Sequence, residues 1–242
     1  MTALVLGATS DIAIAVARQL GSAGYNLQLA ARKMEIVKQL KSDIEIRTQV
    51  SVTIHEFDAL DFESHQLFYL SLPSPPDLVI LVFGFLGDHS KATSDWAECS
   101  KIINTNYVGA VSILNTVALD FEKRKSGTIV GISSVAGERG RMSNYLYGSA
   151  KAGLTAYLSG LRNRLAHSGV HVLTVKPGFV RTQMTEGLPL PALITAEPDQ
   201  AAKRIINAIR KRKNSIYVLP IWAIIMRVIR SIPEPIFKKL RL

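Results

Sequence analysis

Two side chains that can move a proton stand one helical turn apart in the segment Tyr147-Gly-Ser-Ala-Lys151. Residues four apart on a helix share a face, so this spacing places the phenol of Tyr147 beside the ammonium of Lys151. A tyrosine with a pKa near 10 is a poor acid–base group at neutral pH, and we expect the nearby cation to lower that pKa. The pair therefore indicates proton transfer to or from a bound substrate.

Two polar residues earlier in the chain fit the same chemistry. Ser134 directly follows a predicted strand, and its hydroxyl can hydrogen-bond a substrate carbonyl oxygen. Asn106 can position a water that joins Lys151 to solvent. An isolated Tyr-x-x-x-Lys pair is more often an ordinary part of a helix. The order of strand, serine, tyrosine, lysine and a later Pro-Gly break favours a catalytic set instead.

A candidate phosphate-binding turn follows the first predicted strand, in Gly7-Ala-Thr-Ser-Asp11. A glycine at such a turn lets the backbone approach a pyrophosphate, and the following helix N-terminus supplies N–H groups. The usual dinucleotide loop has three glycines, and only Gly7 is present here. Asp11 stands at the second position, where its carboxylate would repel a phosphate unless it points away or is paired. A strand–helix turn without a ligand is the alternative interpretation.

Short β-branched runs alternate with longer stretches of helical spacing along the whole chain. This alternation predicts βαβ units and a doubly wound parallel sheet of about seven strands, with helices on both faces in three α/β/α layers. Residues 183–198, rich in Gly and Pro, are expected to form a mobile loop over the carboxyl ends of the strands. The predicted strands are Ala3–Leu6, Asn26–Ala31, Val52–Phe57, Leu78–Val82, Thr128–Ser133, His171–Lys176 and Ile216–Leu219.

Composition narrows the class of protein. The 242 residues are 48% hydrophobic and 20% charged, which excludes a disordered chain. The single cysteine, Cys99, excludes an intrachain disulfide and, with five scattered histidines, a Cys/His zinc cluster, so we expect no metal. The opening MTALVLGATS lacks a basic n-region, and we expect a cytoplasmic protein. We predict a catalytic domain over residues 1–220 and a basic, amphipathic extension over residues 221–242.

The net charge of +10 comes from the C-terminal end. Residues 203–242 contain 11 Lys or Arg, including Arg241, and a single acid. Ile221, Ile224, Ile225 and Val228 share one helical face. The apolar run 216–226 is about half the roughly 20 residues that a transmembrane helix needs.

Three interpretations of this segment remain open. The helix packs on the body or on a neighbouring subunit, it binds nucleic acid, or it lies on an anionic membrane with Trp222 at the interface. No groove-reading or base-stacking motif accompanies the charge, so we expect no nucleic-acid partner. We favour the membrane surface.

The motifs together resemble those of the short-chain dehydrogenase/reductase superfamily over nearly the whole chain. The resemblance implies a Rossmann-like fold, a nicotinamide cofactor, a homodimer or homotetramer that pairs through helices near residues 94–123 and 145–167, and a catalytic tetrad. One departure is that the usual Asn-Asn-Ala-Gly signature reads Leu81-Val82-Phe83-Gly84. The implied tetrad is Asn106, Ser134, Tyr147 and Lys151, and the implied cofactor-binding residues are Gly7, Thr9, Ser10, Asp11, Ile12, Arg32, Asp58, Ala59, Gly84, Tyr147, Lys151, Pro177, Gly178, Val180 and Thr182.

The second predicted strand indicates which cofactor is bound. An acid at its end would accept the ribose hydroxyls of NAD, whereas a basic residue suits the 2′-phosphate of NADP. The strand is followed by Arg32 and Lys33 with no acid. NADP(H) is therefore favoured and NAD(H) remains open, because a solvated arginine at a loop start is the alternative for Arg32.

A narrower resemblance is to the keto-reductase subunits of decaprenylphosphoryl-ribose 2′-epimerases. It implies reduction of a 2-keto-pentose carried on a polyprenyl phosphate. A general ketone or keto-lipid reductase and a dinucleotide-sensing regulator without turnover are the alternatives. Arg139 and Arg141 can meet a substrate phosphate or lie in a solvated loop. The segments that carry the resemblance are Phe57–Asp61, Phe83–Asp88, Gly137–Arg141, Asn144–Gly153 and Ile232–Leu240.

Overall fold

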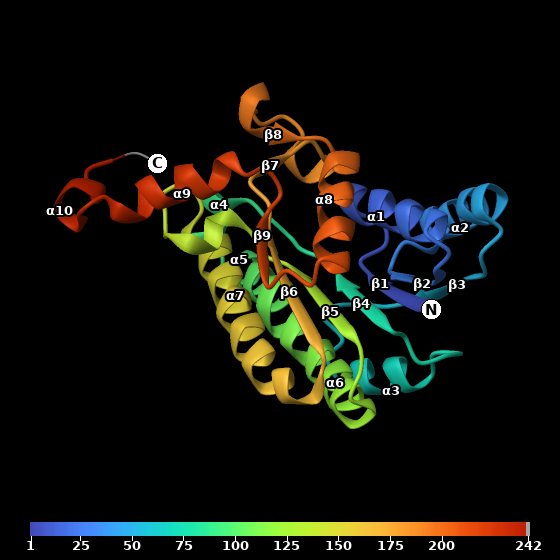
Figure 1. Ribbon diagram of the computed structural model, residues 1–242. Coiled ribbons are helices and arrows are strands. Elements are labelled where there is room, and N and C mark those ends of the chain that lie inside the picture. The colour runs from blue at the N-terminus through green and yellow to red at the C-terminus, as the bar shows by residue number, and fades with distance from the viewer. Residues whose placement is uncertain (241–242) are drawn as a thin grey trace.

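The predicted runs form a seven-stranded parallel sheet in the computed structural model, which describes residues 1–240. The strand order is β3-β2-β1-β4-β5-β6-β9 (Figure 1), so the direction of winding reverses between β1 and β4. Open α/β sheets bind ligands beyond the carboxyl ends of the strands at such a switch point. The strands are β1 Thr2–Leu6, β2 Asn26–Ala31, β3 Val52–Glu56, β4 Leu78–Leu81, β5 Thr128–Ile132, β6 His171–Lys176 and β9 Ser215–Tyr217.

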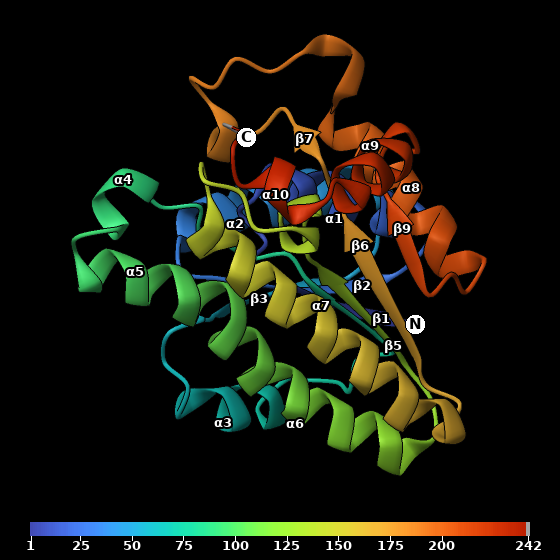
Figure 2. The ribbon, with the colours of Figure 1, turned by 90° about the vertical axis from the view of Figure 1, so that its left-hand side faces the viewer.

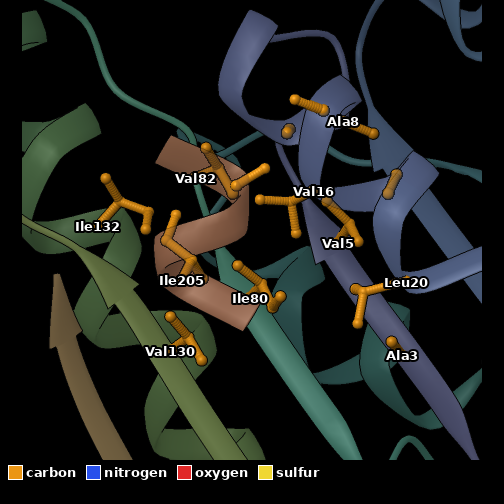
Figure 3. Packing of buried hydrophobic residues seen from close by; sticks show 14 of the residues in the cluster. Ala3, Val5, Ala8, Val16, Leu20, Ile80, Val82, Val130, Ile132 and Ile205 are labelled. Carbon is orange, nitrogen blue, oxygen red and sulfur yellow. The ribbon is translucent and has the colours of Figure 1, made fainter. Parts of the chain in front are cut away.

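The two faces of the sheet are covered by different helices, because side chains alternate along each strand. Ala3 and Val5 of β1 face α1 (Asp11–Ser22), α2 (Met34–Thr48) and α8 (Pro198–Arg210). Leu4 and Leu6 face α3 (Ser64–Leu70), α6 (Gly109–Arg124) and α7 (Tyr145–Leu165). Figure 3 shows the first core, where Val16 and Leu20 of α1 and Ile205 of α8 meet Val5 and Ile80 of the sheet. The predicted three-layer α/β/α fold is confirmed.

One helix of the second face is unusually long. α5 (Trp96–Ile103) continues through a π-helical turn, η1 (Asn104–Val108), into α6. The resulting helix Trp96–Arg124 has 29 residues and is long and apolar enough to cross a membrane by length and composition alone. A core helix meets the same criteria, and here Ile113, Val117 and Phe121 are fully buried in the core with the sheet residues. Figure 2 shows α6 and α7 side by side over this face.

The segment between β6 and α8 lies at the carboxyl end of the sheet. Two short strands that the sequence did not predict pair with each other: β7 (Phe179–Val180) precedes the expected loop 183–198, and β8 (Thr195–Ala196) lies near its end. The loop itself contains the short 3-10 helices η4 (Gln183–Thr185) and η5 (Ala192–Ile194).

The C-terminal extension forms two helices. α9 (Ile221–Ser231) and α10 (Glu234–Phe237) follow β9 and run outward above α7 (Figure 1). The end of the predicted extension, with Arg241, lies outside the described residues. A short helix, α4 (His89–Ala92), lies between β4 and α5.

Candidate active site

A cavity of about 820 Å³ opens at the carboxyl ends of the strands and gathers the sequence-predicted residues. Its walls come from the segments after β1, β2, β3, β4, β5 and β6, together with α7 and the loop after β7. Of the predicted site residues, all but Asn106 line it. They are Gly7, Thr9, Ser10, Asp11, Ile12, Arg32, Asp58, Ala59, Gly84, Ser134, Tyr147, Lys151, Pro177, Gly178, Val180 and Thr182.

The end of β5 and the first turns of α7 hold the predicted proton-transfer residues together. Ser133, the residue before Ser134, donates from its hydroxyl to the Lys151 carbonyl oxygen at 2.9 Å. The Lys151 ammonium donates to the Ile132 carbonyl oxygen at 3.0 Å, and its Nζ lies 5.7 Å from the centre of the Tyr147 ring. Lys151 is only 3% exposed. A buried ammonium fixed in this way is a positive charge beside the phenol.

Burial shifts the two titrating groups in opposite directions. It raises the pKa of Tyr147 to about 12, and the Ser134 hydroxyl only partly offsets the rise. It lowers the pKa of Lys151 to about 8. The expectation that the Tyr147 pKa is lowered is therefore wrong for this structure, because burial disfavours the charged phenolate. At neutral pH Tyr147 is protonated.

Asn106 lies behind the cavity wall. It is buried in the π-helical turn, where its amide donates to the carbonyl oxygens of Phe85 at 2.6 Å and Ile102 at 2.8 Å. Its Oδ1 accepts from the Phe85 N–H at 3.2 Å. A Cβ placed on Gly84 would lie 3.0 Å from this Oδ1 and 3.4 Å from the Lys151 Nζ. Asn106 and Lys151 therefore approach each other across Gly84, where a side chain would be tightly packed. A role of Asn106 in a water relay stays a prediction.

The turn after β1 has the geometry of a phosphate cradle. Gly7 has a φ of +87°, and a Cβ there would lie 2.6 Å from the Phe83 nitrogen, so only glycine fits. Ser10 caps α1 by accepting from the Ala13 N–H at 3.2 Å. The Asp11 carboxylate accepts from the Gln183 N–H at 2.8 Å in the loop after β7. The Asp11 carboxylate thus has a hydrogen-bond donor, which meets the condition that the sequence set for an acid near a phosphate.

Arg32 and Asp58 stand at the ends of β2 and β3. Arg32 is exposed and lines the cavity together with Lys33. The Asp58 carboxylate accepts from the Leu60 N–H at 3.0 Å, which fixes the turn after β3. Their cofactor roles stay predictions.

Trp222 lines the cavity, although it was predicted to lie at a membrane interface. The prediction that it lies at a membrane interface is wrong, since it is 3% exposed, packs edge-on against Phe179 and donates to the Ile194 carbonyl oxygen at 3.0 Å. A Cβ on Gly178 would fall 1.9 Å from its ring. In the sequence, only the glycine at position 178 indicated that another side chain packs closely against the chain there.

Arg139 is also engaged elsewhere. Its guanidinium donates to carbonyl oxygens at the end of α9, those of Ile229 at 2.7 Å and Ile232 at 2.7 Å, and to the Glu234 carboxylate at 3.0 Å. It also stacks on the Phe237 ring at 3.6 Å. Both predicted environments for Arg139, a solvated loop and a substrate phosphate, are therefore wrong. Its side chain instead binds α9 and α10 to the loop after β5.

The comparisons with known proteins agree with this geometry. A family model described as short chain dehydrogenase matches residues 1–191. The chain belongs to that family. It is 36% identical to an uncharacterized oxidoreductase of Mycobacterium tuberculosis over 242 residues, covering 99% of this chain and 92% of that protein. A 3-oxoacyl-[acyl-carrier-protein] reductase of Chlamydia muridarum is 29% identical over 189 residues, which is 77% of this chain and 76% of the relative.

A solved structure shares the fold. The short-chain dehydrogenase from Sphingobium yanoikuyae in complex with NADPH superposes with a TM-score of 0.83 at 20% identity, covering 96% of each chain. As a member of the family, the protein is an oxidoreductase that uses a nicotinamide dinucleotide. The site fits such a cofactor, because Gly7 leaves a cradle for phosphates at the N-terminus of α1 and the cavity runs from there to Tyr147. Among residues 1–240, no group of three or more His, Cys, Asp or Glu could hold a metal ion.

Proposed function

We propose that the protein reduces a ketone to a secondary alcohol with NADPH, and that Tyr147 donates the proton. The observation that carries the proposal is the meeting of Ser134, Tyr147 and Lys151 in one cavity with the N-terminus of α1. When bound, the cofactor supplies a hydride to the carbonyl carbon. The carbonyl oxygen then takes the Tyr147 proton, so the substrate gains one hydride and one proton.

Each residue of the set has a separate task in this scheme. The Ser134 hydroxyl hydrogen-bonds the carbonyl oxygen and stabilises the negative charge that develops on it. Tyr147 starts in the protonated state that a proton donor requires, because its pKa is about 12. The ammonium of Lys151 stabilises the phenolate that remains. Asn106, next to Lys151 across Gly84, supports the return of a proton from solvent.

Two observations favour NADP(H) over NAD(H). β2 ends at Ala31 and is followed by the exposed cations Arg32 and Lys33 at the cavity, with no acid to accept ribose hydroxyls. The structurally similar dehydrogenase from Sphingobium yanoikuyae is in complex with NADPH.

For the substrate, we propose a 2-keto-pentose carried on a polyprenyl phosphate. The sequence segments of the narrower resemblance support it, since Phe83–Asp88 and Asn144–Gly153 contribute residues to the cavity and Ile232–Leu240 includes α10. A second candidate is a ketoacyl thioester, which the name of the chlamydial relative favours.

A side-by-side assay with NADPH tests both. Wild-type protein and Y147F are given a farnesylphosphoryl 2-keto-pentose, acetoacetyl-CoA and a simple cyclic ketone. We expect turnover of the lipid-linked sugar, and a loss of about 10²-fold or more in Y147F with NADPH binding retained. Full activity of Y147F would reject the proton-transfer scheme. Turnover of acetoacetyl-CoA alone would favour the second candidate, and cofactor binding without any turnover would favour a sensing role.

We also propose that the outer face of α9 lies on the cytoplasmic face of an anionic membrane. Ile224 and Val228 are 61% and 57% exposed, and Arg227, Lys238 and Lys239 are exposed nearby. A homodimer or homotetramer that pairs through α5, α6 and α7 remains the proposal for assembly, supported by exposed apolar side chains on these helices such as Trp96 and Leu119.

A further inference from the structure

The cavity wall contains a half-buried cation, Arg141, in addition to the exposed Arg32 and Lys33. Arg141 lines the cavity, and within residues 1–240 its side chain forms neither a hydrogen bond nor an ion pair. Its Nε is completely buried and unpaired. Burial lowers the pKa of the guanidinium, which nevertheless stays charged in proteins. Arg141 is half-buried, and a buried N–H donor without a partner is costly, so such a group is normally compensated by an acceptor or an anion.

The segment that carries Arg141 is fixed at both ends. Arg139, two residues earlier, is bound to the end of α9. The Met142 carbonyl, one residue later, is hydrogen-bonded to the His89 ring at 3.0 Å. The Arg141 carbonyl oxygen accepts from the Asn144 N–H at 3.1 Å, which closes the turn before α7. The backbone of Arg141 is therefore held in place before a ligand arrives.

The position of Arg141 assigns it to the substrate end of the cavity. It stands six residues before Tyr147 and next to Met142, whose carbonyl contacts His89 of α4, whereas Arg32 follows β2, where the adenosine of a dinucleotide is expected. Asn144, which also lines the cavity, has a buried Oδ1 without a hydrogen-bond partner. A cation and an acceptor left unpaired in one wall suit a ligand that carries both an anion and a hydroxyl.

We propose that Arg141 binds a phosphate group of the substrate, with Asn144 accepting from a neighbouring hydroxyl. The assignment rests on the proposed ketone reduction in the same cavity. A guanidinium offers a planar fork of N–H donors that matches two phosphate oxygens, and such charge-assisted bonds are the strong ones. The Arg139 contacts join the segment that carries Arg141 to α9, the helix proposed to touch the membrane. This neighbourhood favours a phosphate that joins a sugar to a lipid.

Direct binding tests the proposal without turnover. Calorimetry with farnesyl phosphate, farnesol and ribose 5-phosphate is carried out on wild type, R141Q and R141K. We expect R141Q to weaken farnesyl phosphate binding about tenfold or more, to change farnesol binding by less than about twofold, and R141K to recover part of the loss. R181Q is the matched control, because Arg181 pairs with Glu197 outside the cavity lining.

Equal binding of farnesyl phosphate by wild type and R141Q would overturn the proposal, as would the same loss in R181Q. Tight, Arg141-dependent binding of both phosphates would support a phosphate site open to soluble substrates. Tight binding of farnesyl phosphate alone would support the lipid-linked source. If wild type binds farnesyl phosphate through Arg141 but reduces no ketone, then the proposed function fails while the anion site stands.

Discussion

At the scale of single residues, the environment decides what Tyr147 and Lys151 can do. The sequence predicted their identities, spacing and shared cavity. It could not predict that burial raises the pKa of one and lowers that of the other, because burial depends on what packs around α7. Both shifts favour the neutral forms. A protonated phenol suits reduction, and an ammonium with a pKa of about 8 loses its charge within the working range of an assay.

The first prediction concerns this ammonium. As pH rises through about 8, Lys151 loses its proton, so the phenolate left by proton donation is no longer stabilised and the reduction rate falls. In K151R the guanidinium stays charged, and the falling limb moves to higher pH. Profiles of kcat/KM for ketone reduction between pH 6 and 10 measure both. The same falling limb in K151R would assign it to another group.

The second prediction concerns the cofactor. Removing the Arg32 cation should raise the KM for NADPH about tenfold and leave the KM for NADH nearly unchanged, since only NADPH carries a 2′-phosphate. K33Q is the matched variant, because Lys33 is the neighbouring cation in the same cavity wall. A larger effect in K33Q than in R32Q would make Lys33 the residue that selects NADPH.

At the scale of elements, the strands were predictable and the two faces of α9 were not. Apart from the half-buried edge strands β3 and β9, the strands are buried and mostly aliphatic, and six of the seven differ from the predicted bounds by at most one residue at either end. α9 is apolar on two sides, with Trp222 and Met226 buried and Ile224 and Val228 exposed. Periodicity identified the outer stripe alone. It also cannot reveal a π-helical turn such as the one that buries Asn106.

The third prediction tests the contact between the Pro-Gly break and α9. A methyl group at Gly178 would clash with the Trp222 ring, so G178A should lower the free energy of unfolding by about 1–3 kcal/mol. W222A should cost about 3–5 kcal/mol through the lost packing. In the double variant the clash is absent, and the combined loss should be smaller than the sum. Urea unfolding of the four proteins measures the difference.

G160A serves as the control for this cycle. Gly160 lies within α7, and a Cβ there meets nothing within 4 Å, so alanine should stabilise the protein by up to about 1 kcal/mol. Strictly additive losses in G178A and W222A would mean that Trp222 does not occupy the space beside Gly178.

At the scale of the whole molecule, the predicted catalytic residues and the basic segment 203–242 are far apart in the sequence but come together at one cavity in the fold. The net charge of +10 resides in residues 203–242, beyond the predicted catalytic residues. α9 nevertheless contributes Trp222 to the cavity and is bound by Arg139 to the segment that carries Arg141. One helix thus has an inner face in the active site and an outer face of exposed Ile224 and Val228. A surface that binds α9 would lie beside the site.

The last prediction follows from that geometry. Wild type should sediment with phosphatidylglycerol vesicles, and less at high salt, because each basic residue near an anionic surface contributes about 1 kcal/mol. K238E/K239E should weaken binding about tenfold or more, and I224D should weaken it by removing apolar contact. L67D is the control, since Leu67 is also exposed, at 72%, and lies on α3, away from the basic segment. Sedimentation unchanged by these variants, or no sedimentation of wild type, would exclude the outer face of α9 as a membrane-binding surface. If the protein is then a dimer in solution and I224D dissociates it, a second copy of the chain covers the outer face of α9.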